Sequence, residues 1–326
     1  MRRETVLFVV RRLLQLVPVV LAIAALNFLL VKMAPGDAAD ILAGQMGHAS
    51  LEFTAQLRRE FGLDLPLVEQ FLVYLRRLAT LDLGTSLIQQ QPVLDLILDR
   101  LPATLLLMVS AIVVAVASGV ALGVVAARRQ GGWLDNVISV AALLVYATPA
   151  FWLGLMLIVL FSIRLDILPS GGMMQIGVTN SPFAHTVDVA RHLVLPALTL
   201  GLFYAAIYAR LMRASMLEVY GQEFITTARA KGLSERSVAW SHAARNALLP
   251  VVTLAGLQLG HLLGGSILIE TVFAWPGLGR LVFDALQQRD LNLLLGILFV
   301  SSVVVVLANL VVDLFYGLLD PRITHK

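Results

Sequence analysis

The stretch EFITTARAKGLSERSVAWSHAARNALLP, residues 223–250, lies between two long apolar runs and decides how the chain is interpreted. It is polar, basic and rich in alanine, whereas a loop that only joined two membrane spans could be far shorter. Ala, Arg and Lys favour a helix over 223–231, and Gly232 is a natural stop because glycine tolerates the left-handed conformation. Ser234 can cap a second helix, with Glu235 in its first turn. We therefore predict two short helices joined at a fixed angle.

The composition around this stretch is that of an integral membrane protein. Of the 326 residues, 59% are hydrophobic and 14% are charged, and the mean hydropathy is +0.86. Soluble proteins contain about half apolar and about a quarter charged residues. The net charge of +3 is too small to indicate a nucleic-acid partner. The chain has no cysteine, which excludes disulfides, thiolate metal sites and cysteine nucleophiles.

The apolar runs predict an all-α membrane protein with six transmembrane helices. A helix needs about 20 apolar residues to cross a bilayer, and six runs qualify: 13–33, 101–127, 136–162, 193–213, 248–270 and 291–317. Their hydrophobicity is continuous rather than alternating, which favours helices over strands. Lys and Arg are more frequent on the side that holds both termini and the quoted stretch, so we expect that side to be cytoplasmic. The first run also resembles a signal peptide, but it is longer than a typical one.

Three parts are expected along the chain: a cytoplasmic N-terminus with the first span (1–33), an extracytoplasmic subdomain (34–100), and a five-helix core (101–326) that contains the cytoplasmic loop 214–247. In the second part, apolar residues three or four apart in LEFTAQLRREFGL and VEQFLVYLRRLATL predict short helices. A floppy loop is the alternative, and it is disfavoured because this segment is rich in leucine and aromatic residues.

No motif for catalysis or for cofactor binding is found in the sequence. It contains no phosphate-binding G-x-x-x-x-G-K-[ST], no H-E-x-x-H and no G-x-S-x-G. We therefore expect that this chain is not an enzyme and that it binds no cofactor or metal itself. Ionisable residues inside the spans are sparse, and no relay of carboxylates is visible, which disfavours an ion-coupled transporter or channel.

Small residues, prolines and one histidine inside the spans are candidates for a translocation path or gate. Glycines that recur every four residues share one helix face, where they either pack against a neighbour or leave room for a substrate. A proline removes a backbone hydrogen bond and can kink a helix at a gate or in ordinary packing. A lone histidine is either a packing residue or a substrate ligand. The candidates are Pro149, Gly256, Gly260, His261 and Gly264.

Two further patterns are assigned to structure. Gly119 and Gly123, with Ala115 before them, are predicted to serve helix packing. Residues 275–277, Trp-Pro-Gly, resemble a re-entrant turn or a short outer loop that could touch a partner protein, and Trp133 and Trp275 fit aromatic belts at the membrane surface.

The small side chains of residues 223–231 suit a helix that docks in a groove of another protein. Arg229 and Lys231 can then contact acidic residues. The alternative is an amphipathic helix that rests on lipid headgroups, for which the apolar face is weak.

At these residues the chain resembles the permease subunits of binding-protein-dependent ABC importers. The segments TARAKGL (227–233) and RNALLP (245–250) match the cytoplasmic loop of the dipeptide/oligopeptide/nickel permease family, in the first of its two permease types. Thr226 and Thr227 replace the Glu and Ala of the generic loop, and Ala38 replaces a usual proline. Further matching segments are MAPGD (33–37), DLGTS (82–86), RLPATL (100–105), TPAFW (148–152), ETVFAWPGLG (270–279) and LDPR (319–322).

The resemblance implies a type I ABC importer permease fold in the bacterial inner membrane. It implies that the loop helix is a coupling helix, seated on an ATPase subunit through Glu223, Thr227, Ala228, Arg229, Ala230, Lys231, Gly232 and Leu233. The implied partners are a second homologous permease, two ATPases that hold ATP and Mg, and an extracytoplasmic substrate-binding protein. Di- or oligopeptides are the implied substrates, with nickel, glutathione, opines and oligosaccharides as alternatives.

Overall fold

The computed structural model describes residues 2–33, 64–86, 88–175 and 181–319, together with residues 55, 59 and 177. Within these residues the chain is helical, and the only extended pairing is an isolated bridge between Thr85 and Pro92. This confirms the predicted all-α class for the described part of the chain. In order, the helices are α1 (Arg2–Met33), α4 (Leu67–Ala79), α5 (Val93–Arg128), α6 (Trp133–Ala147), α7 (Ala150–Leu157), η1 (Ile158–Arg164), α8 (Pro182–Tyr220), α9 (Glu223–Ala230), α10 (Glu235–Ser237), η2 (Val238–Ala243), α11 (Ala244–Val272), α12 (Leu278–Gln288) and α13 (Leu291–Leu319).

The chain divides into two compact units, of which the first combines Met1–Arg100 with Val282–Leu314. In this unit, α4 packs on α1 and α13 through a core of Ala24, Leu78 and Phe299. The ring of Phe28 adds contacts with Phe71 and Tyr74, at centroid distances of 5.3 and 5.9 Å. The helix predicted within VEQFLVYLRRLATL is thus present as α4, whereas the one predicted within LEFTAQLRREFGL lies outside the described residues except for positions 55 and 59.

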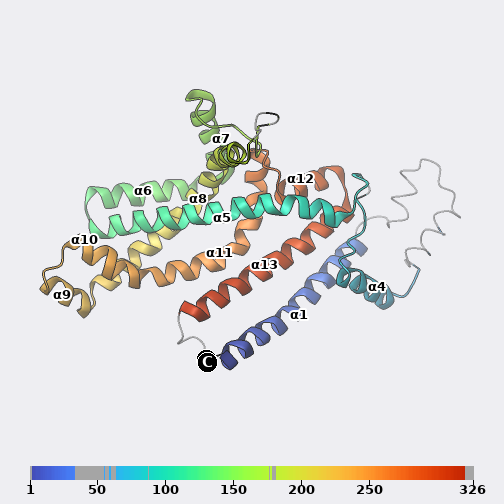
Figure 1. Cartoon of the computed structure of the whole chain (residues 1–326), viewed down its shortest axis with the longest axis horizontal. Helices are drawn as coiled ribbons and strands as arrows, with labels where there is room; N and C mark the ends of the chain where they lie inside the picture. Colours follow the sequence, from blue (N-terminus) through green and yellow to red (C-terminus); the bar gives the residue numbers. More distant parts are fainter. Residues whose placement is uncertain are drawn as a thin grey trace. The chain divides into compact units, whose positions relative to one another are not determined.

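The second unit contains Leu101–Leu281, and α8 lies at its centre. Ser181 caps α8 by accepting a hydrogen bond from the Ala184 amide at 3.1 Å, and Pro182 follows at the first helical position. The helices α6, α7 and α11 all pack against α8, and Figure 1 shows α5, α6 and α8 running alongside one another. Of the apolar window of α8, 67% is buried, compared with 28% for Val93–Arg128 and 17% for Leu291–Val312.

Glycines allow α5 to approach α8 closely. A Cβ placed on Gly119 would lie 2.6 Å from the Cβ of Tyr208, and one on Gly123 would lie 2.6 Å from the Cβ of Met212. Both distances are far shorter than a van der Waals contact between carbon atoms. The predicted packing role of these two glycines is therefore confirmed.

The third predicted span, 136–162, bends at Pro149, one of the prolines expected to kink a helix, and the bend is sharp enough to divide the span into two helices. Helix α6 ends at Ala147, and the chain turns by 107° before α7 and η1. The cause is Pro149, because a residue before proline is driven out of helical geometry. Thr148 accordingly has φ −84° and ψ 132°, and Pro149 begins the new helix as its N-cap.

Four of the six predicted spans find support in the described residues. The helices Val93–Arg128, Pro182–Tyr220 and Leu291–Val312 are long and apolar enough to cross a membrane, and the bent pair α6 with α7–η1 can form a fourth span. The runs at 13–33 and 248–270 are helical in α1 and α11, but their spanning of the membrane stays a prediction.

The segment Trp275–Gly277 is a turn between α11 and α12 with a structural role, as predicted, but Trp275 lies in the protein core and not in an aromatic belt. The side chain of Trp275 is 0% exposed, and its indole Nε1 donates a hydrogen bond to the Ala103 carbonyl at 2.8 Å. Beside it, Glu270 accepts hydrogen bonds from the Thr104 hydroxyl at 2.8 Å and from the Arg280 amide at 3.0 Å. The turn thus joins α5, α11 and α12, and a partner protein cannot reach Trp275 without disrupting this core.

Candidate functional site

The short helix α9 is the centre of the candidate site. It is anchored by Ile225 and Ala228, which are 0% and 5% exposed. The opposite side of the segment is open to solvent. Seven of the eight residues predicted to contact an ATPase are exposed, namely Glu223, Thr227, Arg229, Ala230, Lys231, Gly232 and Leu233. Ala228, the eighth, faces inward and is an anchor of α9 rather than part of its outer surface.

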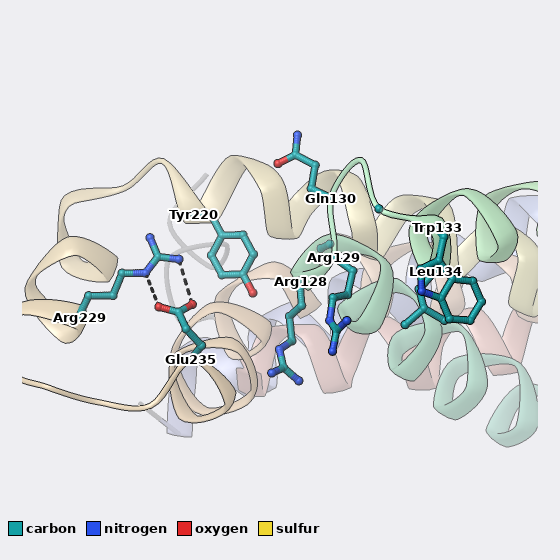
Figure 2. A pocket seen from close by; sticks show the side chains of 10 residues that line it. Arg128, Arg129, Gln130, Trp133, Leu134, Tyr220, Arg229 and Glu235 are labelled. Carbon is teal, nitrogen blue, oxygen red and sulfur yellow. Dashed lines mark hydrogen bonds and ion pairs between the residues drawn. The ribbon is translucent and has the colours of Figure 1, made fainter.

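The angle between α9 and α10 is held by three local features. Gly232 has φ +76°, the left-handed conformation that ends α9 as predicted. The Ser234 hydroxyl caps α10 by accepting a hydrogen bond from the Ser237 amide at 3.3 Å. Arg229 then bridges the two helices, since its Nε and Nη2 donate to the Glu235 carboxylate at 2.9 and 3.2 Å (Figure 2). These contacts make the segment a defined shape.

The ion pair between Arg229 and Glu235 changes the titration of both groups. Hydrogen bonding from Arg229 holds the pKa of Glu235 below its ordinary value. Hydrogen bonding to Glu235 raises the pKa of Arg229. The guanidinium also lies over the ring of Tyr220, 5.6 Å from its centroid, which adds a cation–π contact to the end of α8.

A one-turn π-helix, η2, connects this segment to α11. Val238, Ala239 and Ala243 are buried in it, and η2 packs against α9, α11 and α8. The residues at both of its junctions, Ser237 and Ala243, keep right-handed helical dihedrals, so the backbone runs without a break from α10 into α11. π-helical turns are rare and occur frequently at functional sites. A displacement of α9 would therefore be passed directly to the long helix α11.

An open pocket of about 730 Å³ lies beside α9 (Figure 2). Its rim carries Arg128, Arg129 and Arg229 against a single carboxylate, Glu235. Within the described part of the chain, the side chains of Arg128 and Arg129 make no hydrogen bond or ion pair. The lining residues are Ala127, Arg128, Arg129, Gln130, Gly132, Trp133, Leu134, Tyr220, Arg229 and Glu235. The pocket thus offers positive charge to an acidic partner. Trp133, on its edge, is exposed, and its place in an aromatic belt stays a prediction.

A buried ion pair behind the pocket was not identified from the sequence. Arg213 of α8 donates to both carboxylate oxygens of Asp135 in α6, at 2.6 and 2.7 Å. The Gly131 amide donates to the same carboxylate at 2.9 Å. The side chain of Asp135 is only 3% exposed. The pair therefore fixes the α5–α6 loop, and with it the pocket rim, against α8. The one feature of the sequence that could have indicated this ion pair is an aspartate directly before an apolar run.

The candidate path residues fall in two places. Pro149 lies at the break between α6 and α7, and α7 packs against both α8 and α11. In α11, Gly256 is buried, Gly260 is half-buried and Gly264 is exposed. A Cβ on Gly264 would meet no heavy atom within 4 Å. His261 lies in α11, but its side chain is outside the described part of the structure.

Potential metal ligands do not gather in the described residues. No group of three or more His, Asp or Glu side chains lies close enough there to hold a metal ion.

Comparison with known proteins identifies what this architecture is similar to. Residues 119–325 match the family model described as binding-protein-dependent transport system inner membrane component, and residues 5–108 match the model of the corresponding N-terminal region. The dipeptide transport system permease protein DppB of Escherichia coli strain K12 is 42% identical over 336 residues, covering 98% of this chain and 99% of the relative.

Two further relatives extend the range of substrates named. The di/tripeptide transport system permease protein DppB of Pseudomonas aeruginosa strain UCBPP-PA14 is 40% identical over 333 residues. The glutathione transport system permease protein GsiC of Escherichia coli strain K12 is 40% identical over 319 residues. Each alignment covers 98% of this chain and 99% of the relative.

Proposed function

Because this chain belongs to the family of binding-protein-dependent transport system inner membrane components, we propose that it is the permease subunit of an ATP-driven importer of di- or oligopeptides. The peptide assignment is supported by the relatives named for dipeptides and di/tripeptides, and glutathione is itself a tripeptide. The same fold importing nickel, opines or oligosaccharides is a weaker alternative, since none of these relatives is named for such a substrate.

The observation that carries the mechanism is the packing of α9 on η2, together with the continuous helical backbone from α10 through η2 into α11. The exposed side of α9 has small side chains and basic residues, which suit a groove with acidic walls on an ATPase subunit. The arginines on the pocket rim add positive charge beside it. In the proposed mechanism, closure of two ATPases displaces α9 and turns α11, and the spans change between inward-open and outward-open states as rigid bodies.

The proposed assembly contains this chain, a second homologous permease, two ATPases and an extracytoplasmic substrate-binding protein in the bacterial inner membrane. ATP and Mg would be held by the ATPases, and this chain would hold no cofactor and catalyse no reaction. Both termini, α9 and the pocket would then be cytoplasmic, since Lys and Arg are concentrated on that side of the sequence.

The test uses the absence of cysteine from the natural sequence. Ala230→Cys places one thiol on the exposed side of α9, where a benzophenone maleimide can be attached. Irradiation of the assembled complex is expected to link this position to an ATPase chain, with a yield that changes when ATP is added. Ala228→Cys is the matched control, because Ala228 lies on the buried side of the same helix and should label poorly.

The opposite result is equally informative. If the adducts of the Ala230→Cys protein form only with lipid, in membranes that contain the folded ATPases, then α9 is a helix on the lipid surface. The coupling mechanism would be wrong in that case.

A further inference from the structure

Arg210 of α8 lies on an aromatic cluster and has unused hydrogen-bonding capacity. Its guanidinium carbon lies over the Tyr146 ring, 5.0 Å from the centroid. Tyr146 stacks on Phe203 at 5.6 Å, and Phe203 meets Tyr204 edge-on at 5.3 Å. Arg210 is exposed, and within the described part of the chain its side chain makes no hydrogen bond or ion pair. The cluster therefore holds the guanidinium without using its N–H groups.

The cluster lies on the surface of the second unit, along the contact between α6 and α8. The ion pair between Asp135 and Arg213 aligns the start of α6 with the end of α8. Tyr146 lies farther along α6, about 16 Å from Asp135 at about 1.5 Å per residue. Helical side chains also lean toward the helix N-terminus, so Arg210 points away from the Tyr220 end of α8.

This orientation is opposite to that of an arginine that keeps its charge at the membrane surface. Long basic side chains near a span end normally extend to the nearer interface. A charged side chain at the centre of a span costs about 2.5–3.5 kcal/mol on insertion scales, and charged residues inside spans usually line water-filled cavities or pathways. The face with Arg210 and Tyr146 therefore borders water or a polar partner rather than lipid.

We propose that Arg210, held on Tyr146 and Phe203, is a station on the translocation path that binds the C-terminal carboxylate of a passing peptide. The inference rests on the proposed function and names the substrate group that this part of the path recognises. Guanidinium N–H groups lie in a planar fork that fits a carboxylate with two hydrogen bonds. Because the ring occupies a face of the guanidinium, its in-plane N–H groups remain available.

A second observation connects the cluster to α11, the helix that carries the candidate path glycines. The Tyr204 hydroxyl lies 3.6 Å from the position that a Cβ on Gly265 would take. The preceding residue, Gly264, belongs to the row of glycines that was predicted from the sequence to line the path, and it has open space around its Cα. Because adjacent residues of a helix do not face the same side, this contact joins the aromatic cluster to α11 beside the glycine face and not on it. Aromatic rings also suit the varied side chains of peptides, which no fixed polar site would accommodate.

The experiment replaces Arg210 with cysteine. The thiol can then be modified with a reagent that adds either a positive or a negative charge. Arg210→Cys is reconstituted with the second permease, the ATPases and the binding protein, whose reactive cysteines have been removed. ATP-dependent import of a radiolabelled dipeptide is expected to fall about tenfold, because a charge-assisted contact is lost. Modification with an aminoethyl methanethiosulfonate, which adds a cation, should restore import, whereas the sulfonatoethyl reagent, which adds an anion, should not.

Arg164→Cys serves as the matched control. Arg164 is exposed at the end of η1 and makes no hydrogen bond or ion pair within the described residues, so import should be unchanged by the substitution and by either reagent.

Two results would overturn the proposal. If neither water-soluble reagent modifies Arg210→Cys in the assembled complex, then the residue lies against lipid or against the second permease. If import by Arg210→Cys equals that of the natural protein, or if both reagents restore it equally, then Arg210 does not bind a carboxylate. Failure of the natural complex to import peptide at all would instead refute the proposed function.

Discussion

At the scale of single residues, Gly232 and Glu235 determine the shape of the coupling segment. Gly232 supplies the positive φ that ends α9, and no atom near it would hinder a side chain. Glu235 supplies the carboxylate that holds Arg229 across the turn. The effect of each residue on the coupling segment can be measured separately with a single conservative substitution.

We expect Gly232→Ala to destabilise the protein by about 1–2 kcal/mol, because an L-residue is strained in the left-handed region. Gly264→Ala is the matched control. Gly264 is helical and also has open space around its Cα, so alanine there should be neutral or stabilising by up to about 1 kcal/mol. Thermal unfolding of the purified protein in detergent measures both. Equal shifts for the two variants would contradict the assignment of strain to Gly232.

The ion pair between Arg229 and Glu235 predicts a pH dependence with a defined sign. The pKa of Glu235 is lowered in the folded protein, so its stabilisation is fully present above the ordinary carboxyl pKa of about 4.5. It is lost as the pH falls through the lowered value. Hydrogen–deuterium exchange of the α9 amides, corrected for intrinsic rates, should show more protection than in Glu235→Gln at pH 7. The difference should shrink as the pH is lowered below 4.5 and Glu235 takes up its proton.

The expected difference is modest, because exposed ion pairs contribute at most about 1 kcal/mol. A difference between the proteins that is as large at pH 3 as at pH 7 would show that the charge of Glu235 is not responsible.

At the scale of elements, the second unit depends on contacts that lock helices in register. The ion pair of Asp135 with Arg213 sets α6 against α8, and Gly119 and Gly123 set α5 against α8. Together they place the α5–α6 loop beside the α9–α10 turn and so create the pocket.

The two partners of the buried ion pair are expected to contribute unequally. Arg213→Met leaves the Asp135 carboxylate, 3% exposed, without its counter-ion, and should destabilise the protein by about 3–5 kcal/mol. Asp135→Ala leaves the guanidinium of Arg213, which is 31% exposed and partly hydrated, and should cost less. The double variant should be more stable than Arg213→Met alone. Thermal unfolding of the three proteins measures the cycle, and additive effects would argue against a coupled pair.

At the scale of the whole molecule, the proposed function requires that α4 and α9 lie on opposite sides of the membrane. The helix α4 precedes the second predicted span, and α9 follows the fourth. The connection from α9 to α11 can transmit a movement of the ATPases to the spans only if α9 lies on the ATPase side of the membrane.

Single cysteines test this arrangement, since the natural chain has none. Val68→Cys in α4, where the side chain is 71% exposed, should react with a membrane-impermeant maleimide in spheroplasts. Ala230→Cys in α9 should react only after the membrane is opened. Labelling of both positions from the same side would refute the proposed orientation.

The sequence by itself determined the features that depend on local physical chemistry. The long apolar runs predicted a helical membrane protein, because backbone groups in lipid must be satisfied within each segment. Gly232 and Ser234 predicted the end of α9 and the start of α10, because a positive φ and a capping hydroxyl act on neighbouring residues only. The family resemblance rested on such segments in order along the chain, and the relatives confirm it.

Only the tertiary structure decided the features that depend on residues far apart in the chain. Asp135 meets Arg213, Trp275 meets Ala103, and Arg210 meets Tyr146, each across a separation that no local pattern reveals. The same reason explains why Ala228 faces inward. The contribution of a charged or aromatic side chain in a membrane protein depends on the helices packed beside it. A low dielectric strengthens its interaction with a partner and raises the cost of having none.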